Sequence, residues 1–316
     1  MKVLVELALF DAGFGPRRTR PVSGPLSTDG RRGALERPAS ERLIWFILWL
    51  LVITISNLLG SSTQVCAWEE DVHLGLTKWL ALNAGFKPGD ADTVSEFDQS
   101  LDTGHFTNPP WAVMLHVVLD GDPEASRQLQ KWHFPSYGRV PGTPEERKVT
   151  HDSTAATIGV EDALKVHPGE PIAAALENLG EQLHPFQDSW SHEGVPDIPF
   201  RPAWPMFPEL NWAHPQTRGG WYSHAADLTY LHVDQTLEMA GRTYELLCQF
   251  LTLNRLTPIA RQPTWEQLTN VVRQFAKAKT RRAKKQWFLE HGFDVNHAQQ
   301  IVNDLSLPSR DFPPQN

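Results

Sequence analysis

Apolar positions recur at helical spacing along several stretches of the chain. In residues 68–86 they fall at positions 72, 76, 79 and 80, and Gly85 marks the end of this predicted helix. Residues 233–254 show the same period more clearly, and residues 265–290 predict a further helix. Few stretches alternate between apolar and polar residues as half-buried strands do. The pattern therefore predicts an all-α protein.

Prolines and capping residues place the other predicted helices. Thr93, with a glutamate three positions later, predicts a capping box at a helix start. Residues 153–166 predict one helix, and residues 171–192 predict a longer one in which Pro185 removes a backbone hydrogen bond and introduces a kink. Residues 195–220 contain six prolines and predict a long irregular loop, of the kind that lines binding sites.

The segment before residue 68 has a different character. Residues 43–56 are strongly apolar, and Val65 and Ala67 occupy the −3 and −1 positions that a signal peptidase accepts. The sequence therefore predicts a signal peptide over 43–67, cleaved near Ala67, and a secreted or periplasmic protein. A retained membrane anchor is the alternative, but the apolar run is shorter than the roughly 20 residues that span a bilayer.

Residues 1–42 predict a leader that is disordered or is mis-annotated sequence upstream of the true start, which leaves residues 68–316 as the folded domain. Without residues 1–67 the chain has 21 Lys and Arg against 32 Asp and Glu, a net charge of −11. This balance disfavours a protein that binds duplex nucleic acid by bulk attraction. Cys248 is the only cysteine left, so stability has to come from the core and from any bound metal.

The stretch from Leu179 to Gly194 carries the most distinctive chemistry. It places His184, Asp188 and His192 at i, i+4 and i+8, which lie on one face of a helix. Two imidazoles with a carboxylate between them can hold a cation such as zinc through short bonds from nitrogen and oxygen. A hydrogen bond between His and Asp on the helix is the alternative interpretation.

Further nitrogen and oxygen donors lie before this stretch. His73 follows Trp68 by five residues, and cleavage before Trp68 would create a free α-amino group that can chelate a metal beside His73. Asp98 and Asp102 share one helix face, where surface acids are common but one carboxylate could point inward. His133 lies in an aromatic loop before a proline, a position that suits either packing or a metal ligand.

Downstream, His224 and Asp227 lie at i, i+3, with His232 close by. The donors include no thiolate, and their number exceeds the need of one tetrahedral zinc. They suit a cluster in which a carboxylate bridges two ions. The candidate metal ligands are Trp68, His73, Asp102, His133, His184, Asp188, His192, His224 and Asp227.

In their order, these residues resemble those of the zinc-dependent phospholipase C and fungal single-strand nuclease superfamily. The resemblance covers most of residues 68–234. It implies a single multi-helical all-α domain of that type. The shared features are a processed N-terminal Trp68, a helical His73, an Asp102 ending the next helix, a loop His133 and a Leu-Gly-x-x-Leu-His-x-x-x-Asp core over 179–188.

The resemblance also implies how two or three zinc ions would be held. The amine and carbonyl of Trp68 would bind one ion together with His73. Asp102, His133 and His184 would bind a second ion, and Asp188 would bridge the two. His192, His224 and Asp227 would bind the third. Asp102 would also orient or deprotonate the attacking water, which makes it the predicted catalytic residue.

The spacing departs from the pattern of the superfamily around the third ion. Three residues separate Asp188 from His192 where the family usually has five, and two separate His224 from Asp227 where it usually has three. Asp98 is an alternative to Asp102. Two other histidines, His214 and His232, are alternatives to His224.

The set as a whole predicts a hydrolase. We expect a secreted multinuclear zinc phosphodiesterase, phospholipase C-like, that cleaves phospholipid or another phosphodiester through attack by metal-bound hydroxide. One alternative is a single-strand nuclease or 3′-nucleotidase in which aromatic residues over 195–222 stack bases. The other is a non-catalytic metal-stabilised binding protein. The basic residues over 277–285 predict a solvated face, with phosphate head groups or RNA as alternative partners, and no feature predicts a stable protein partner.

Overall fold

A computed structural model of the chain describes residues 68–104, 109–198, 207–221 and 223–309, which all belong to one unit within residues 61–316. These residues form helices and loops, and they contain two isolated β-bridges but no strand. The all-α prediction is therefore confirmed. The predicted leader and signal peptide lie outside the described residues.

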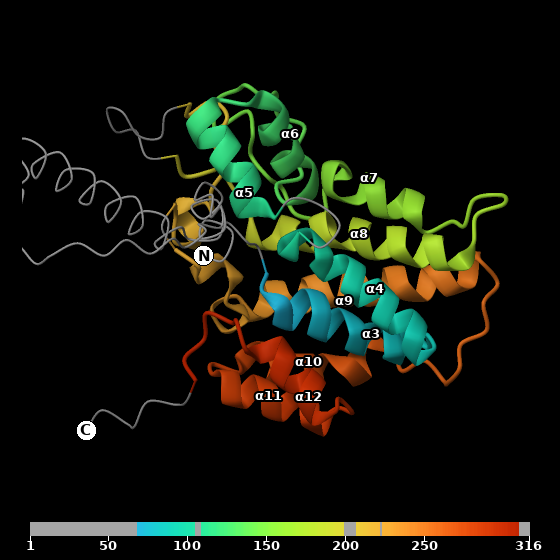
Figure 1. The fold of residues 1–316 in the computed structure, drawn as a ribbon. Helices are drawn as coiled ribbons and strands as arrows, with labels where there is room; N and C mark the ends of the chain where they lie inside the picture. The colour runs from blue at the N-terminus through green and yellow to red at the C-terminus, as the bar shows by residue number, and fades with distance from the viewer. Residues whose placement is uncertain (1–67, 105–108, 199–206, 222, 310–316) are drawn as a thin grey trace, which may run out of the picture. The chain divides into compact units, whose positions relative to one another are not determined.

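Four helices that lie near one another in Figure 1 contribute to the main hydrophobic core, together with residues of α7 (Thr154–Ala163) and of the last three helices described below. The four are α3 (Thr77–Ala84), α4 (Pro88–Thr103), α8 (Ile172–Ser191) and α9 (Val233–Leu253). The chain enters α3 through a π-helical turn, η1 (Asp71–Leu76), whose residues are all buried. Helix α8 packs along α4, because Gly180 has no side chain to separate the two backbones. This close crossing brings the buried faces of α4 and α8 together.

A second, smaller core lies around Phe134 and Trp212. It is built largely by α5 (Pro110–Leu115), the π-helical turn η2 (His116–Asp120) and α6 (Pro123–Trp132). Helix α7 (Thr154–Ala163) packs against α8. The last helices are α10 (Trp265–Lys277), α11 (Arg281–Glu290) and α12 (Val295–Val302).

Two predicted helix boundaries are wrong. Helix α4 begins at Pro88 rather than near Thr93, because proline fixes the backbone for the first helical turn and needs no N–H partner there. The predicted helix over 265–290 is two helices, since Ala278 is extended and Thr280 caps the start of α11 with its side chain. Helix α9 lies within one residue of its predicted end.

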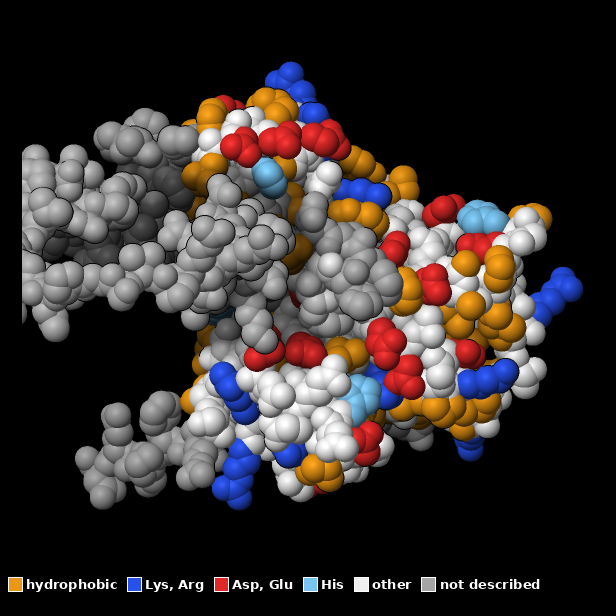
Figure 2. All heavy atoms as spheres, in the orientation of Figure 1, with side chains coloured by type: hydrophobic (Ala, Val, Ile, Leu, Met, Phe, Trp, Pro, Cys, Tyr) orange, Lys and Arg blue, Asp and Glu red, His pale blue; other side chains and the backbone are white. Residues whose placement is uncertain are grey.

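The basic residues over 277–285 do not form one solvated face. The Lys284 side chain is buried and lies 2.6 Å from Asp71, while Arg281 donates to two backbone carbonyl groups near the end of α12. On the face drawn in Figure 2, Lys and Arg side chains are scattered among acidic and uncharged ones. None of the helices in the described ranges is long and apolar enough to cross a membrane.

Candidate metal centre

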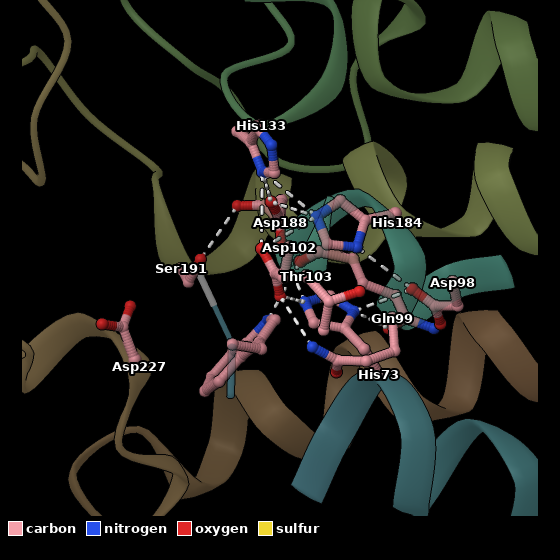
Figure 3. Close-up of polar contacts among 12 residues, drawn as sticks. His73, Asp98, Gln99, Asp102, Thr103, His133, His184, Asp188, Ser191 and Asp227 are labelled. Atoms are coloured by element: carbon pink, nitrogen blue, oxygen red, sulfur yellow. Dashed lines mark hydrogen bonds and ion pairs between the residues drawn. The ribbon is translucent and has the colours of Figure 1, made fainter. Parts of the chain in front are cut away.

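The structure brings five of the nine predicted ligands together. His184 and Asp188 lie one turn apart on the buried face of α8, and Asp102 lies in the last turn of α4. His73 comes from η1, and His133 directly follows α6. Figure 3 shows these side chains pointing toward one another. Residues separated by up to 115 positions in the chain thus share one site.

Four donor atoms surround the first position in this site. The atoms His133 Nδ1, His184 Nε2 and Asp188 Oδ2 form a triangle with sides of 3.1–3.2 Å. The Asp102 Oδ1 atom lies 3.8 Å from His133 Nδ1 and 3.6 Å from His184 Nε2. Ligand atoms of a tetrahedral zinc with bonds of about 2.0–2.2 Å are about 3.3–3.6 Å apart. The distances in this site lie within about 0.2 Å of that range, so the four side chains could hold a tetrahedral metal ion.

A second position shares Asp188 with the first. The other oxygen of this carboxylate, Oδ1, lies 3.1 Å from His73 Nε2. The same His73 atom lies 4.0 Å from Asp102 Oδ2. Since Asp188 presents one oxygen to His73 and the other to His133 and His184, its carboxylate can bridge two ions.

Several buried atoms of the site have no well-aligned hydrogen bond, although His73 Nε2 and Asp188 Oδ1 form an ion pair when the ring is protonated. They include His73 Nε2, Asp102 Oδ1 and Asp188 Oδ1. Leaving a buried polar group unsatisfied costs about 1–3 kcal/mol, and more for a charged group. A cation bound between these atoms would remove that cost. The donor set and its unsatisfied atoms therefore fit a bound metal ion.

Asp98 also points into the site, although the sequence offered it only as an alternative to Asp102. Its side chain is fully buried, and its Oδ1 lies 2.8 Å from His73 Nδ1. Thr77 donates a hydrogen bond to its Oδ2 at 2.8 Å. Both aspartates of α4 are thus part of the centre. Their i, i+4 spacing was the signal for this, whereas the contribution of Thr77 has no signature in the sequence.

The residues predicted to bind a third ion lie near one another, but His214 is part of the group as well. His192 ends α8 and stacks on His214 with ring centroids 5.0 Å apart, and its Nε2 is buried without a hydrogen bond. The His214 Nε2 atom lies 3.0 Å from Asp227 Oδ1, and His224 Nδ1 lies 3.3 Å from Asp227 Oδ2. The third group thus contains His214 in addition to the predicted His192, His224 and Asp227. His214 lies in the proline-rich loop, whose path the sequence does not reveal.

Trp68 anchors the start of the described chain beside the centre. Its side chain is fully buried, and its indole N–H donates to the backbone oxygen of Gln187 at 3.0 Å. This contact ties Trp68 to α8, one residue before Asp188. The predicted cleavage after Ala67 lies outside the described residues, so the role of a Trp68 amine as ligand stays a prediction.

Burial and mutual charge shift the pKa values in the centre. Burial alone would lower the pKa of His184, but Asp188 and Asp102 raise it to about 9 against the opposing charge of His73. Burial would raise the pKa of Asp188, yet the neighbouring histidines hold it well below its usual value. Burial and His214 hold the pKa of His192 well below its usual value, so this imidazole is neutral. Without a cation, the centre therefore keeps protons to balance its carboxylates.

Comparison of the chain with protein-family models, with curated proteins and with solved structures found no match. The resemblance to the phospholipase C and nuclease superfamily stays a prediction. The described residues define an all-helical protein with buried His and Asp groups that could hold a metal ion.

Proposed function

We propose that this protein is a zinc-dependent hydrolase of phosphate esters, phospholipase C-like in its reaction. The observation that carries the proposal is the placement of Asp188, whose two oxygens face different histidines at 3.1–3.2 Å. One carboxylate serving two adjacent positions is the arrangement that two-metal hydrolases use. His73 would belong to one position, and His133 with His184 to the other.

Zinc bound at these positions would supply polarisation of a phosphoryl oxygen and a lowered pKa of a bound water. The protein's own part is to fix the donors in place and to admit the ester. Asp102 is suited to orienting the reacting groups, because it lies at the boundary between the buried cluster and a cavity of 490 Å³. It is the residue that we assign to orientation of the attacking water.

This cavity supports an ester with an uncharged or positively charged organic group. Its lining includes four carboxylates, Glu69, Glu70, Asp102 and Asp304, together with Trp111. Burial raises the pKa of Glu69 and of Glu70 to about 7, so these two carboxylates carry only part of their charge at neutral pH. The negative charge that remains repels a polyanionic nucleic-acid strand and favours a cationic head group. The proposal therefore prefers phospholipid or another small phosphodiester over single-stranded nucleic acid.

A second cavity, of 390 Å³, has His133 in its lining. Its walls combine apolar side chains, among them Val113, Leu129 and Trp132, with the polar ones of Glu124, Gln128 and Lys131. Its apolar side chains suit the apolar part of a lipid-like ester.

The test measures zinc content and hydrolysis in the same purified protein. We expect bound zinc and cleavage of phosphatidylcholine vesicles, with both lost on chelation and restored by added zinc. Cleavage of single-stranded DNA in place of the lipid would support the nuclease alternative. Zinc without turnover of either substrate would mean a metal-stabilised binding protein, and a protein that takes up no metal would contradict the proposal altogether.

A further inference from the structure

The Asp98 carboxylate contacts the Nδ1 atoms of both His73 and His184. The Oδ1 atom of Asp98 lies 2.8 Å from His73 Nδ1 and 3.3 Å from His184 Nδ1, and all three side chains are fully buried. The two rings stack with centroids 4.1 Å apart. In Figure 3 both rings lie between Asp98 on one side and Asp102 with Asp188 on the other.

The opposite nitrogen of each ring faces the candidate metal positions. His73 Nε2 lies 3.1 Å from Asp188 Oδ1, and His184 Nε2 lies 3.2 Å from Asp188 Oδ2. A neutral imidazole has one lone pair available for a metal, and its other nitrogen carries a proton. If each Nε2 binds an ion, each Nδ1 is an N–H donor in need of an acceptor.

Two other side chains hold Asp98 in position to accept from both rings. Thr77 donates its hydroxyl hydrogen to Asp98 Oδ2 at 2.8 Å, and Gln187 donates from Nε2 to the Thr77 oxygen at 2.9 Å. The carbonyl oxygen of the same Gln187 side chain accepts from His73 Nδ1 at 3.0 Å, so this nitrogen has Gln187 as well as Asp98 within reach as acceptor. These contacts leave Asp98 Oδ1 and His184 Nδ1 without a well-aligned hydrogen bond of their own, and donation from the ring to the carboxylate would satisfy both.

We propose that Asp98 is a positioning residue shared by His73 and His184, which fixes the proton on Nδ1 of each ring and so couples the two metal positions. Carboxylates that accept from the distal nitrogen of a metal-bound histidine orient the ring and make it a stronger ligand. Here one carboxylate does this for ligands of two different ions. His73, Asp98 and His184 are also close enough to hold a cation through the two Nδ1 atoms. With both Nε2 positions occupied, however, such a cation would require each ring to bind metal through both nitrogens, and this would remove its last proton.

The inference rests on the metal centre of the proposed function and is tested without measuring catalysis. Zinc affinity and zinc count at saturation are measured for the full chain, for Asp98→Asn and for Asp98→Ala, by competition with a coloured chelator. Loss of such an outer partner typically weakens metal binding about 10- to 100-fold. We expect this loss at both positions, with the count at saturation unchanged.

Glu96→Gln is the matched control, because it removes one negative charge from an exposed position on the same helix. It should bind zinc like the unchanged protein. Thr77→Val keeps the shape at position 77 but removes the hydroxyl that holds Asp98. It should therefore lower zinc affinity at both metal positions, by a smaller factor than the Asp98 substitutions do. This variant serves as a second test if the Asp98 substitutions prevent folding.

Three other results would contradict either the role of Asp98 or the metal centre on which it depends, and they can be told apart. One ion fewer at saturation in Asp98→Ala would make Asp98 a direct ligand and overturn the inference. Unchanged zinc affinity with reduced stability would make Asp98 a purely structural residue. Failure of the unchanged protein to take up zinc would overturn the metal centre itself. In the loaded protein, nitrogen-labelled histidines should show two slowly exchanging Nδ1–H signals that disappear in Asp98→Ala.

Discussion

Gly180 of α8 lies so close to Val94 of α4 that a β-carbon added to Gly180 would be 2.3 Å from the Val94 carbonyl oxygen. Each of these residues is one helical turn before a residue of the metal centre, His184 on α8 and Asp98 on α4. The close crossing therefore sets the distance between the two faces of the centre. We expect Gly180→Ala to lower the free energy of unfolding by about 1–3 kcal/mol and to weaken zinc binding, since backbone has to move.

Gly89→Ala is the control for this substitution. Gly89 is also in α4, and no heavy atom lies within 4 Å of the β-carbon that alanine would add. Alanine there should leave stability unchanged or raise it by up to about 1 kcal/mol. Urea denaturation and zinc titration give both quantities. Equal stability and zinc affinity for Gly180→Ala and Gly89→Ala would contradict the role of the crossing.

Asp188→Ala and Asp102→Ala should differ in how much metal they lose. Asp188 faces both positions, whereas Asp102 Oδ1 faces His133 and His184 most closely. We expect Asp188→Ala to lose both tightly bound ions and to melt at a lower temperature, because metal binding contributes to folding. Asp102→Ala should keep one ion. Metal analysis after gel filtration distinguishes them, and full zinc content in Asp188→Ala would remove the bridging assignment.

At the predicted third metal position, substitution of His214 and substitution of His224 should affect metal binding differently. His214 Nε2 lies 3.0 Å from Asp227 Oδ1, a buried atom without a hydrogen bond, and its ring stacks on His192. His224 contacts the other oxygen of Asp227 and is about one-third exposed, at 31%. A third ion, where one is counted, should be lost in His214→Ala and retained in His224→Ala. The reverse result would restore His224 as the third-position ligand.

The stability of the metal-free protein should depend on pH through His184. Its pKa is about 9 in the folded protein against 6.5 for an ordinary histidine. A pKa raised on folding contributes stability that is complete below the unfolded value and is lost as the pH rises through the folded value. We therefore expect the melting temperature in chelator to fall between about pH 6.5 and pH 9.

Zinc should change this dependence in a defined direction. Zinc binds the neutral imidazole, so it competes with the proton on His184 and binds more tightly as the pH rises toward 9. Calorimetry in buffers of different ionisation enthalpy should detect release of protons on zinc binding at pH 7. His184→Gln should release fewer protons, and equal release by the two proteins would contradict the assignment.

The buried Asp71–Lys284 pair predicts a large loss of stability when one partner is removed. The two charges lie 2.6 Å apart, and Lys284 also donates to Thr229 at 2.8 Å. Asp71→Asn leaves the ammonium group buried without its counter-charge, which should cost about 3–5 kcal/mol. The double variant Asp71→Leu with Lys284→Met should lie closer to the unchanged protein.

Arg282→Met, at an exposed position on the same helix, is the control for the loss of a positive charge. It should change stability by about 0.5 kcal/mol or less. Chemical denaturation of the metal-free protein measures all of these variants. Asp71→Asn as stable as Arg282→Met would show that the buried pair does not stabilise the fold.

The helical class and the heart of the site could be predicted because both follow from local spacing. Period and length identified α9, and the i, i+4 spacing of His184 and Asp188 put both side chains on one face of α8. The spacing did not show whether Asp98, Asp102 or both point into the site. An i, i+4 pair shares a face whether that face is buried or not, and only the packing of α4 on α8 decides it.

Loops set the other limit on prediction from sequence. His192 was expected on the continuing face of α8, but the helix ends at Ser191 and the His192 ring turns to stack on Phe134. His214, which stacks on the same ring, lies in a proline-rich segment without helical periodicity, so the sequence did not place it beside His192. The break between α10 and α11 was missed for a related reason, because Thr280 satisfies helix α11 from a position that also fits helical periodicity.

The reach of Lys284 into the interior has a consequence for how the protein is made. Its partner Asp71 lies at the opposite end of the described chain, next to residues that hold the metal centre. During synthesis Asp71 leaves the ribosome long before Lys284. The Asp71 carboxylate therefore lacks this counter-charge until residue 284 has emerged. The Asp71–Lys284 contact can therefore form only late in synthesis, and a truncation before α11 would remove the counter-charge of Asp71 in η1.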